Sequence, residues 1–454
     1  MEQLSRSGLS VIRRESELIV SATATPREIK HPREIKHLSD IDDREGLRFH
    51  ISNFFFFYEH NPSMEGIDPA KVIKDGLSKA LVFYYPLAGR LILGPNGKHM
   101  VNCNGEGILF TEAYANVELE MLGESIKPPC PFVEDLLYNV PGSDGITNCP
   151  LMLIQVTRFT CGGFALAVRV NHTMVDAAGL VLFLNAVTDF VKFKASAPSI
   201  IPVWQRDTLN ARPSPRITCK HHEFEEEIES TNAWLKLEKE LIQRSFFFGE
   251  EEIEAIRNQV SPLHRSTGRF ELLTSFLWRH RTISLNLNPE EIVRLTYFVT
   301  ARGRFEHWKI PHGYYGNAFA FPAAVSKAGL LSTYPLTYAL ELIKKAKNQV
   351  NEEYFRSMVD FMVIKGRPGI TQSWNFAISN TAHVGFDKVD FGWGEPKYGG
   401  AAKVDSCFSF FVACKNYKGQ KGILTTISLP PKAMERFEDF MYKLTSNVKQ
   451  LSKL

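Results

Sequence analysis

The sequence lacks any apolar run long enough to cross a membrane. Among its 454 residues the most apolar short run is Phe54–Tyr58, which has the length of a strand, whereas a membrane helix needs about 20 apolar residues. The opening stretch, MEQLSRSGLSVIRRESE, lacks the continuous apolar core of a signal peptide and contains too many acidic residues for a transit peptide. We therefore expect a soluble cytoplasmic protein with no membrane partner.

Cysteine and net charge are both scarce. The 7 cysteines are scattered, odd in number and include no CxxC pair, so neither a disulfide framework nor a zinc site is predicted. The 53 basic and 50 acidic residues leave a net charge of +3, which argues against a broad nucleic-acid-binding surface.

Several signature motifs of catalysis are also missing. The chain contains no GxxxxGK[ST] loop, no GxGxxG after a strand, no GxSxG elbow and no HExxH pair. Nucleotide hydrolysis, dinucleotide redox chemistry, serine-nucleophile chemistry and metal-assisted chemistry therefore have no support. We expect neither a metal nor a permanently bound cofactor.

Apolar residues supply ample material for a core, because 44% of the chain is hydrophobic and 33 residues are phenylalanine. Asp68-Pro69 predicts a helix start, and strand and helix patterns alternate along the chain. The stretch 198–215 is rich in proline and has no periodicity, as is typical of a linker. We predict an α/β protein with an N-terminal domain (1–197), a crossover linker (198–215) and a C-terminal domain (216–454).

Two local features have a simple interpretation. The hexapeptide Pro26–His31 recurs as Pro32–His37, and two copies of so short a period cannot build a solenoid. We interpret it as a local duplication in a solvated segment. The acidic runs Glu225–Glu227 and Glu250–Glu252 are interpreted as solvated faces.

One histidine lies where a strand gives way to a helix. The strand pattern of 164–170 is followed by Asn171-His172-Thr173-Met174-Val175-Asp176, and apolar residues at helical spacing follow from Leu180. His172 and Asp176 form an HxxxD pair, although His383 and Asp387 form a second one. The strand–helix junction and the small residues 177–179 favour His172, because such junctions place side chains at the mouth of a cleft.

A histidine can take a proton from a hydroxyl or an amine near pH 7. The sequence supplies this base without a matching nucleophile, which indicates direct transfer between two bound substrates. The alternative for each histidine is a structural role, and we favour that interpretation for His383. The spacing leaves open whether Asp176 orients the imidazole or fixes the loop.

A glycine-rich segment, Asp390-Phe391-Gly392-Trp393-Gly394, follows about 215 residues later. By itself it predicts a tight turn with aromatic packing and an indole N–H that needs a partner. Together, HTMVD and DFGWG resemble the motifs of the plant BAHD family of acyl-CoA-dependent acyltransferases. Further family-like stretches occur in order along nearly the whole chain: LSDID (38–42), YYPLAGR (84–90), QVTRF (155–159), CGG (161–163), TSFLWR (274–279), ARGR (301–304) and GYYGN (313–317). The duplicated hexapeptide and the segment 305–311 depart from the family pattern.

The resemblance implies two chloramphenicol-acetyltransferase-like domains joined by a crossover loop, with strand exchange near 385–415 and a central channel. His172 would lie in this channel and deprotonate an acceptor alcohol or amine. The acceptor would then attack acyl-CoA, the co-substrate, without forming an acyl-enzyme. A monomer with two small-molecule substrates is expected.

Further residue roles come from the same resemblance. Asp390 is a candidate catalytic residue and also a candidate ion-pair partner of Arg302, whereas Asp176 is expected to be architectural and to pair with an arginine. Phe391, Gly392 and Gly394 are supporting residues. Trp393 is a candidate for positioning the acyl group or the oxyanion. The remaining substrate-binding candidates are Thr173, with Ser275 and Lys397 for the CoA phosphates.

The stretches NHTMVDAAG (171–179) and GNAFAFPAA (316–324) resemble the clade of benzyl alcohol O-benzoyltransferases, methanol anthraniloyltransferases and alkaloid O-tigloyltransferases. We therefore expect transfer of a benzoyl or similar group to an alcohol such as benzyl alcohol. The alternatives are an alkaloid O-acyltransferase or an N-acyltransferase of the same family, an acyl-CoA hydrolase, and a protein whose site has decayed. The chemistry of the motifs does not identify the donor or the acceptor.

Overall fold

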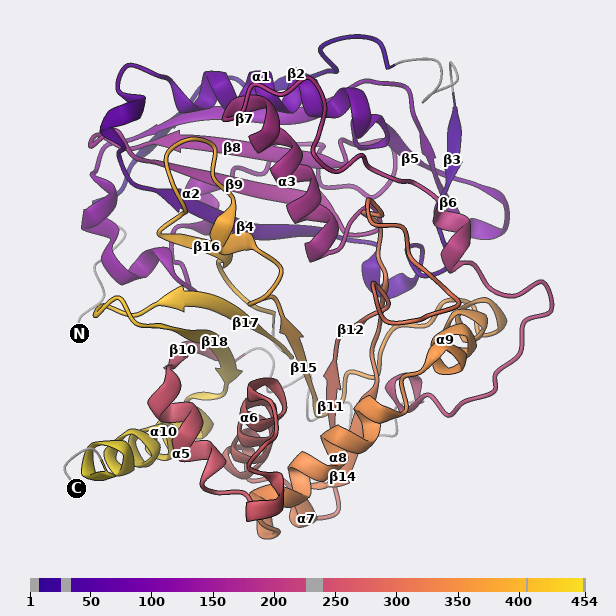
Figure 1. Ribbon diagram of the computed structural model, residues 1–454, viewed down its shortest axis with the longest axis vertical. Coiled ribbons are helices and arrows are strands. Elements are labelled where there is room, and N and C mark those ends of the chain that lie inside the picture. The colour runs from indigo at the N-terminus through magenta and orange to yellow at the C-terminus, as the bar shows by residue number, and fades with distance from the viewer. Residues whose placement is uncertain (1–7, 26–33, 226–239, 406, 452–454) are drawn as a thin grey trace.

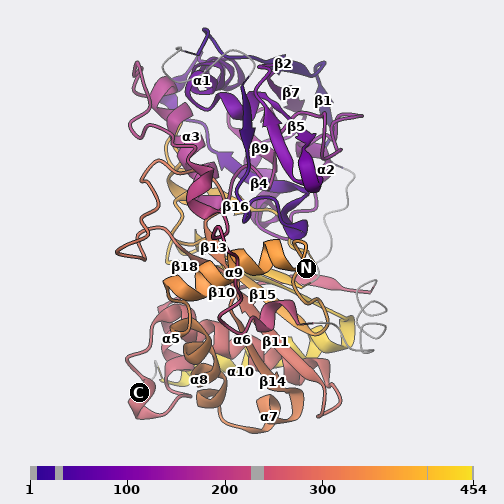
Figure 2. The ribbon, with the colours of Figure 1, turned by 90° about the vertical axis from the view of Figure 1, so that its right-hand side faces the viewer.

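The computed structural model describes residues 8–25, 34–225, 240–405 and 407–451, and these form two lobes, each built on a mixed β-sheet (Figures 1 and 2). The first sheet has the order β1-β7-β8-β9-β4-β16, and β2 also pairs with β7. Its strands are β1 (Val11–Arg13), β2 (Glu17–Ile19), β4 (His50–Tyr58), β7 (Ile108–Ala115), β8 (Met152–Arg158), β9 (Phe164–Asn171) and β16 (Tyr398–Ala401). A small sheet, β3-β6-β5, lies beside it and comprises β3 (Ile35–His37), β6 (His99–Asn102) and β5 (Arg90–Leu93).

The second lobe contains a six-stranded sheet of order β10-β18-β17-β15-β11-β14. Its strands are β10 (Ile242–Phe248), β11 (Ile292–Tyr297), β14 (Ala323–Lys327), β15 (Asn375–Asn380), β17 (Phe408–Lys415) and β18 (Lys421–Leu429). A two-stranded pair, β12 (Val299–Thr300) and β13 (Phe319–Ala320), stands apart from it.

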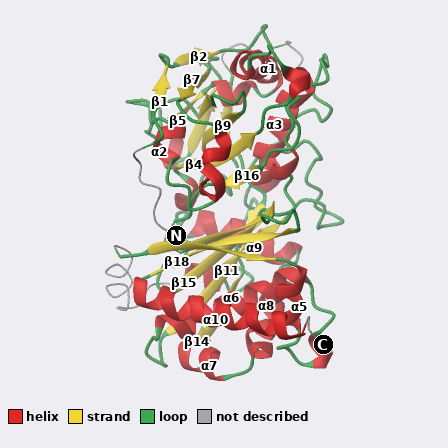
Figure 3. Ribbon diagram, turned by 90° about the vertical axis from the view of Figure 1, so that its left-hand side faces the viewer, coloured by secondary structure: helices red, strands yellow, loops and turns green. Residues whose placement is uncertain are grey.

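Helices cover the outer faces of both sheets (Figure 3). The first lobe carries α1 (Pro69–Phe83), α2 (Val133–Leu136) and α3 (Ala177–Val191). The second carries α5 (Glu250–Arg257), α6 (Arg269–Leu285), α7 (Ala328–Thr333), α8 (Leu336–Asn348), α9 (Glu352–Ile364) and α10 (Pro431–Leu451). No helix in these described ranges is both long and apolar enough to span a membrane.

The phenylalanine run of β4 is explained by burial on both faces of the first sheet. Phe54, Phe56 and Tyr58 join the core beneath α1 and α3. Phe55 and Phe57 point to the opposite face, where they join a cluster containing residues of β17 and β18 from the second lobe. Successive strand residues alternate between faces, so a strand covered on both sides is apolar throughout.

The strand β16 crosses from one lobe to the other. Although it belongs to the C-terminal part of the chain, it pairs antiparallel with β4, from Tyr398 opposite Phe57 to Ala401 opposite Phe54. In Figure 1 it appears as an orange segment at the edge of the indigo and magenta strands. The two lobes are therefore joined by strand pairing as well as by the linker.

The local elements follow their sequence signals. The Asp68 side chain accepts a hydrogen bond from the Ala70 amide at the start of α1, and α3 coincides with the predicted helical stripe. Residues 26–33 of the duplicated hexapeptides and 226–227 of the first acidic run lie outside the described residues. The end of the second hexapeptide forms the edge strand β3, where Ile35 and His37 are exposed, so this solvated stretch has regular structure.

Candidate active site

His172 immediately follows β9, in the turn that leads to α3. Its backbone N–H donates to the Phe49 carbonyl at 2.9 Å, and its Nδ1 lies 3.0 Å from the Val175 carbonyl oxygen. Because a carbonyl oxygen can only accept, Nδ1 carries the proton in this contact. The lone pair of the neutral imidazole is therefore on Nε2, which leaves Nε2 able to accept a proton.

Two aromatic rings lie beside this imidazole. The Phe49 ring lies edge-on at 5.4 Å between centroids, and the Phe319 ring lies at 6.2 Å. Burial, together with the positive charge of Arg44, lowers the pKa of His172 below its usual 6.5, while Asp176 acts weakly in the opposite sense. The ring is thus neutral at neutral pH and ready to act as a base.

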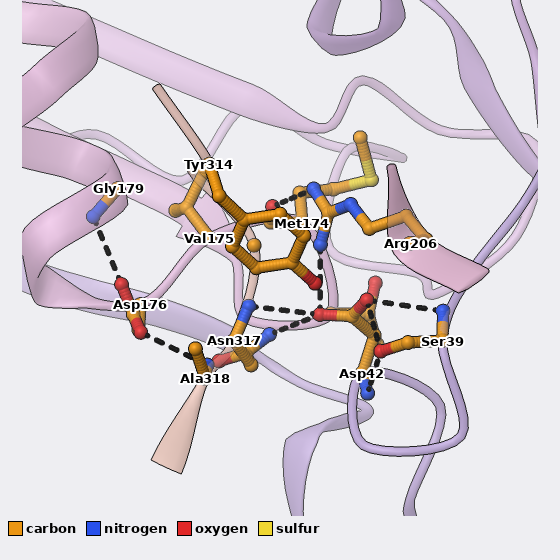
Figure 4. Close-up of polar contacts among 12 residues, drawn as sticks. Ser39, Asp42, Met174, Val175, Asp176, Gly179, Arg206, Tyr314, Asn317 and Ala318 are labelled. Carbon is orange, nitrogen blue, oxygen red and sulfur yellow. Dashed lines mark hydrogen bonds and ion pairs between the residues drawn. The ribbon is translucent and has the colours of Figure 1, made fainter. Parts of the chain in front are cut away.

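Asp176 is fully engaged in structural contacts. One oxygen accepts from the Gly179 amide and so caps α3, and the other accepts from the Ala318 amide. Arg302 forms a two-pronged ion pair with the same carboxylate, at 2.6 and 3.0 Å. In Figure 4 Asp176 reaches toward Gly179 on one side and Ala318 on the other. The carboxylate therefore joins the start of α3 to the second lobe.

A second buried cluster holds the backbone of the His172 turn (Figure 4). The Asn317 side chain donates to the His172 carbonyl at 2.7 Å and to Asp42 at 2.9 Å. Arg206 donates to the Met174 carbonyl and to Asp42, both at 2.8 Å. The linker, the LSDID stretch and the second lobe thus meet at this turn.

These supporting residues were missed as site residues from the sequence. Asp42 and Asn317 lie within the stretches LSDID and GYYGN, which pointed to the family without indicating any role. Arg206 lies in the linker, and no local pattern marks it. What marks them is the complete burial of polar or charged side chains, and Arg206 is only 1% exposed. This burial is visible only in the folded chain.

The DFGWG segment lies far from His172. Asp390 accepts from the Gly392 and Gly394 amides and from Lys192, just past the end of α3. Although partial burial opposes it, these hydrogen bonds lower the pKa of Asp390. The predicted ion pair between Asp390 and Arg302 is wrong, because Arg302 is bound to Asp176. Since α3 is about 22 Å long, Asp390 lies at the far end of it from His172, too far away to act on a group bound at that imidazole.

Trp393 is also distant from His172. Its ring packs edge-on against Phe164 at 5.2 Å, and it is 7% exposed within the core of the first lobe. Phe164 begins β9 and His172 follows its end, so about 25 Å of strand separates them. At this distance the Trp393 indole cannot position an acyl group or an oxyanion beside His172, as the resemblance had led us to expect. Its neighbour Phe391 packs on Tyr58, and Gly392 and Gly394 adopt the positive φ angles of a tight turn.

The other predicted substrate contacts are differently placed. The Thr173 hydroxyl is buried and donates to Asn171. The Ser275 hydroxyl is buried inside α6 and donates to the Leu272 carbonyl, so it cannot reach a CoA phosphate. Lys397 is partly exposed and pairs with Glu59 at 2.8 Å.

A cleft of about 400 Å³ opens beside the junction between β9 and α3. Phe49, which touches the His172 ring, forms part of its wall. The remaining lining is mostly polar and consists of His50, Ser52, Val133, Glu134, Leu137, Tyr138, Asn139, Asp144, Ile146, Arg169 and Lys403. Within the described ranges no group of three or more His, Cys, Asp or Glu side chains could hold a metal ion.

Comparison with known proteins gives consistent matches. Residues 9–444 match the model of the Transferase family. The chain is 51% identical over 449 residues to Alcohol acyl transferase 2 of Malus domestica, covering 98% of this chain and 96% of the relative. It is 49% identical over 438 residues to Alcohol acyltransferase 16 of Actinidia chinensis var. chinensis, covering 96% and 94% of the two chains.

Two solved structures have the same fold. The crystal structure of Vinorine Synthase superposes with a TM-score of 0.72 at 20% identity, over 94% of this chain and 96% of that one. The structure of F. sporotrichioides TRI101 complexed with Coenzyme A and T-2 gives a TM-score of 0.66 at 14% identity, over 89% and 97%.

Proposed function

The chain belongs to the Transferase family, as a plant BAHD acyltransferase, and from this premise we propose that it esterifies alcohols with acyl groups taken from acyl-CoA. The observation that carries the proposal is the state of His172. Its Nδ1 proton is fixed by the Val175 carbonyl, so Nε2 can receive a proton. Relatives named as alcohol acyltransferases, about half identical over nearly the full length, support an alcohol as the acceptor.

The proposed reaction needs no covalent enzyme intermediate. His172 Nε2 takes the hydroxyl proton as the alcohol oxygen forms a bond to the thioester carbonyl carbon, and the carbonyl electron pair moves onto oxygen. The tetrahedral adduct collapses when the C–S bond breaks. The imidazolium then returns its proton to the CoA sulfur. This sequence yields an ester and free CoA, and it restores the neutral base.

The donor that we propose is benzoyl-CoA or a similar aromatic acyl-CoA, and the acceptor is benzyl alcohol or a similar small alcohol. The Phe49 and Phe319 rings beside the imidazole favour a flat apolar group there. Apolar pockets distinguish similar groups by only about 1–3 kcal/mol per methylene, so we expect several alcohols to react. We further propose a monomeric cytoplasmic enzyme, which size-exclusion chromatography and localisation of a tagged protein would test.

The test is a matrix of acetyl-, benzoyl-, anthraniloyl- and tigloyl-CoA against alcohols and amines, with products identified by mass spectrometry. Esters support the proposal. Amides would instead indicate an N-acyltransferase, esters confined to alkaloid alcohols an alkaloid O-acyltransferase, and free acid alone a hydrolase.

The role of His172 has a matched control in the second HxxxD histidine, because His383 is exposed. His172→Ala should lower kcat by at least about 100-fold, whereas His383→Ala should leave it unchanged. Thermal unfolding of both variants checks that they fold. A folded His172→Ala enzyme with wild-type turnover would overturn the mechanism.

Lys397 remains a proposed contact for the CoA phosphates because its side chain is partly exposed. Lys397→Glu should raise the KM for acyl-CoA. An unchanged KM would remove this residue from the site.

A further inference from the structure

Arg44 is a buried charge for which the described residues supply no hydrogen-bond partner. Its side chain is 2% exposed, and none of its three guanidinium nitrogens has a hydrogen-bond partner among the described residues. Arg206, buried to the same degree, is by contrast bound to Asp42 and to the Met174 carbonyl. An unpaired buried charge is strongly destabilising, so a guanidinium kept in this state calls for an anionic hydrogen-bond partner that the described residues do not supply.

The Arg44 guanidinium and the His172 imidazole lie beside the same aromatic ring, that of Phe319. The guanidinium carbon of Arg44 lies 3.9 Å from the centre of the Phe321 ring and 4.8 Å from that of Phe319. Phe319 is in turn 6.2 Å from the His172 ring. The aromatic faces hold the guanidinium plane by cation–π contacts and supply no acceptor for its N–H groups.

Two neighbouring carboxylates, Asp42 and Glu223, act on the charge of Arg44 without forming a hydrogen bond to it. Both oxygens of Asp42 are taken, one by Arg206 and Asn317 and the other by Ser39. One oxygen of Glu223 accepts from Tyr354 and contacts His221, while its other oxygen is buried without a hydrogen-bond partner. A direct bond between Glu223 and Arg44 would satisfy both groups, and the structure does not form it.

We propose that Arg44 donates hydrogen bonds to a negatively charged oxygen of the substrate beside His172. This inference rests on the proposed function. The oxygen has two possible sources with the same chemistry: the oxyanion of the tetrahedral adduct and a carboxylate carried by the acceptor. A guanidinium suits both because its N–H groups form charge-assisted, two-pronged hydrogen bonds to oxygen anions.

The kinetic experiment compares Arg44→Met, Arg44→Lys and the wild type with benzyl alcohol and with 4-(hydroxymethyl)benzoate, at saturating acyl-CoA. An oxyanion partner predicts a fall in kcat of at least about 100-fold with both acceptors, with partial recovery in Arg44→Lys because the charge is kept. A carboxylate partner predicts a raised KM for the benzoate acceptor alone. Unchanged kcat and KM with both acceptors would overturn the proposal.

Thermal unfolding separates a substrate contact from a structural role. If Arg44 waits for a ligand, Arg44→Met removes an unmatched charge and should leave the Tm of the free enzyme equal or higher. Arg48→Met is the control on the same loop, because Arg48 pairs with Asp43; it should lower Tm and leave kcat unchanged. A lower Tm of Arg44→Met with wild-type kinetics would overturn the proposal and assign Arg44 to the fold.

A binding measurement keeps this test independent of catalysis. Benzoate should raise the Tm of the wild type and not that of Arg44→Met, because a ligand that binds only the folded state stabilises it. If the wild type forms no ester, the proposed function fails. The benzoate measurement still shows whether Arg44 binds an anion, because it does not depend on catalysis. Equal benzoate shifts in both proteins would then overturn that site.

Discussion

The imidazole of His172 is prepared by contacts that act on different properties. The Val175 carbonyl fixes which nitrogen carries the proton. Burial and Arg44 then lower the pKa of the ring, which keeps it neutral. A base of lower pKa is weaker but more often in its active form, so the enzyme should retain activity on the acid side of neutrality.

The first prediction concerns the pH dependence of the proposed esterification. The base must be neutral, so kcat/KM for the alcohol should fall as pH drops through the pKa of His172. Because that pKa lies below 6.5, the acidic limb should have its midpoint below 6.5. Arg44→Met removes a positive charge and should move this limb to higher pH, which initial rates between pH 4.5 and 8 would measure. A wild-type midpoint above 6.5 would contradict the electrostatics described here.

Sequence patterns can identify site residues only when the residues that contact one another are also close together in the chain. His172 and Asp176 share one turn, so their spacing and the flanking strand and helix patterns identify them together. Arg302 and Asn317 approach that turn from residues 126 and 145 positions away, which no local pattern encodes. Trp393 is the opposite case, because a local motif identifies the residue but not its position. Only its packing on Phe164 shows that it lies far from His172.

At the scale of elements, the start of α3 packs closely against the second lobe because residue 179 is a glycine and has no side chain. A Cβ atom on Gly179 would lie 1.9 Å from the Tyr315 carbonyl oxygen, a backbone atom that cannot rotate away. The glycine therefore permits the approach that lets Asp176 reach Arg302 and Ala318.

The second prediction follows from this contact. Gly179→Ala should lower Tm and reduce kcat by at least about 10-fold, because α3 must shift away from the loop whose Asn317 holds the His172 carbonyl. Ala178→Gly, one residue earlier, is the control and should cost only about 1 kcal/mol of helix stability. Calorimetry and initial rates measure both effects. Wild-type Tm and kcat values for Gly179→Ala would show that the backbone around Tyr315 accommodates a side chain at position 179 without loss.

The third prediction concerns the DFGWG loop. Trp393→Phe keeps an aromatic ring against Phe164 and should leave kcat within about twofold of the wild type. Trp393→Ala should instead destabilise the protein by about 3–5 kcal/mol, since it empties a core position. Denaturant unfolding and initial rates separate the two effects. A large loss of kcat in a fully stable Trp393→Phe enzyme would restore a role in acyl positioning.

Element prediction was accurate where the hydrophobic period is regular. The start of α1, the helix α3 and the strand β9 follow the patterns that predicted them. The four residues of β16 include two glycines and have little strand propensity of their own, so their exact pairing with β4 is decided by the lobe they join. Tertiary context overrides local preference there.

At the scale of the whole molecule, the candidate site exists only when the lobes are together. The first lobe supplies His172 and Asp176, and the second supplies Arg302, Asn317 and Phe319. The exchange of β16 and the shared core of β4 with β17 and β18 hold these parts in register. Site geometry and global stability are therefore coupled, and conditions that weaken the fold should reduce activity.

Acidification is such a condition. The last prediction concerns how much one buried histidine, His280, contributes to the loss of folding stability at low pH. His280 lies in α6, where its Nδ1 donates to the Phe276 carbonyl and its ring packs on Phe276 and Phe440. Burial lowers its pKa from 6.5 to about 4, so the unfolded state binds the proton first as pH falls. This difference in pKa stabilises the folded state by about 3 kcal/mol above pH 6.5. The contribution to the free energy of unfolding is lost as pH falls from 6.5 to about 4. His280→Phe keeps the ring packing and cannot titrate, so its free energy of unfolding should fall less than that of the wild type between pH 7 and pH 4. Denaturant titrations across this range measure the difference, and parallel curves for the two proteins would show that His280 keeps its ordinary pKa in the folded state.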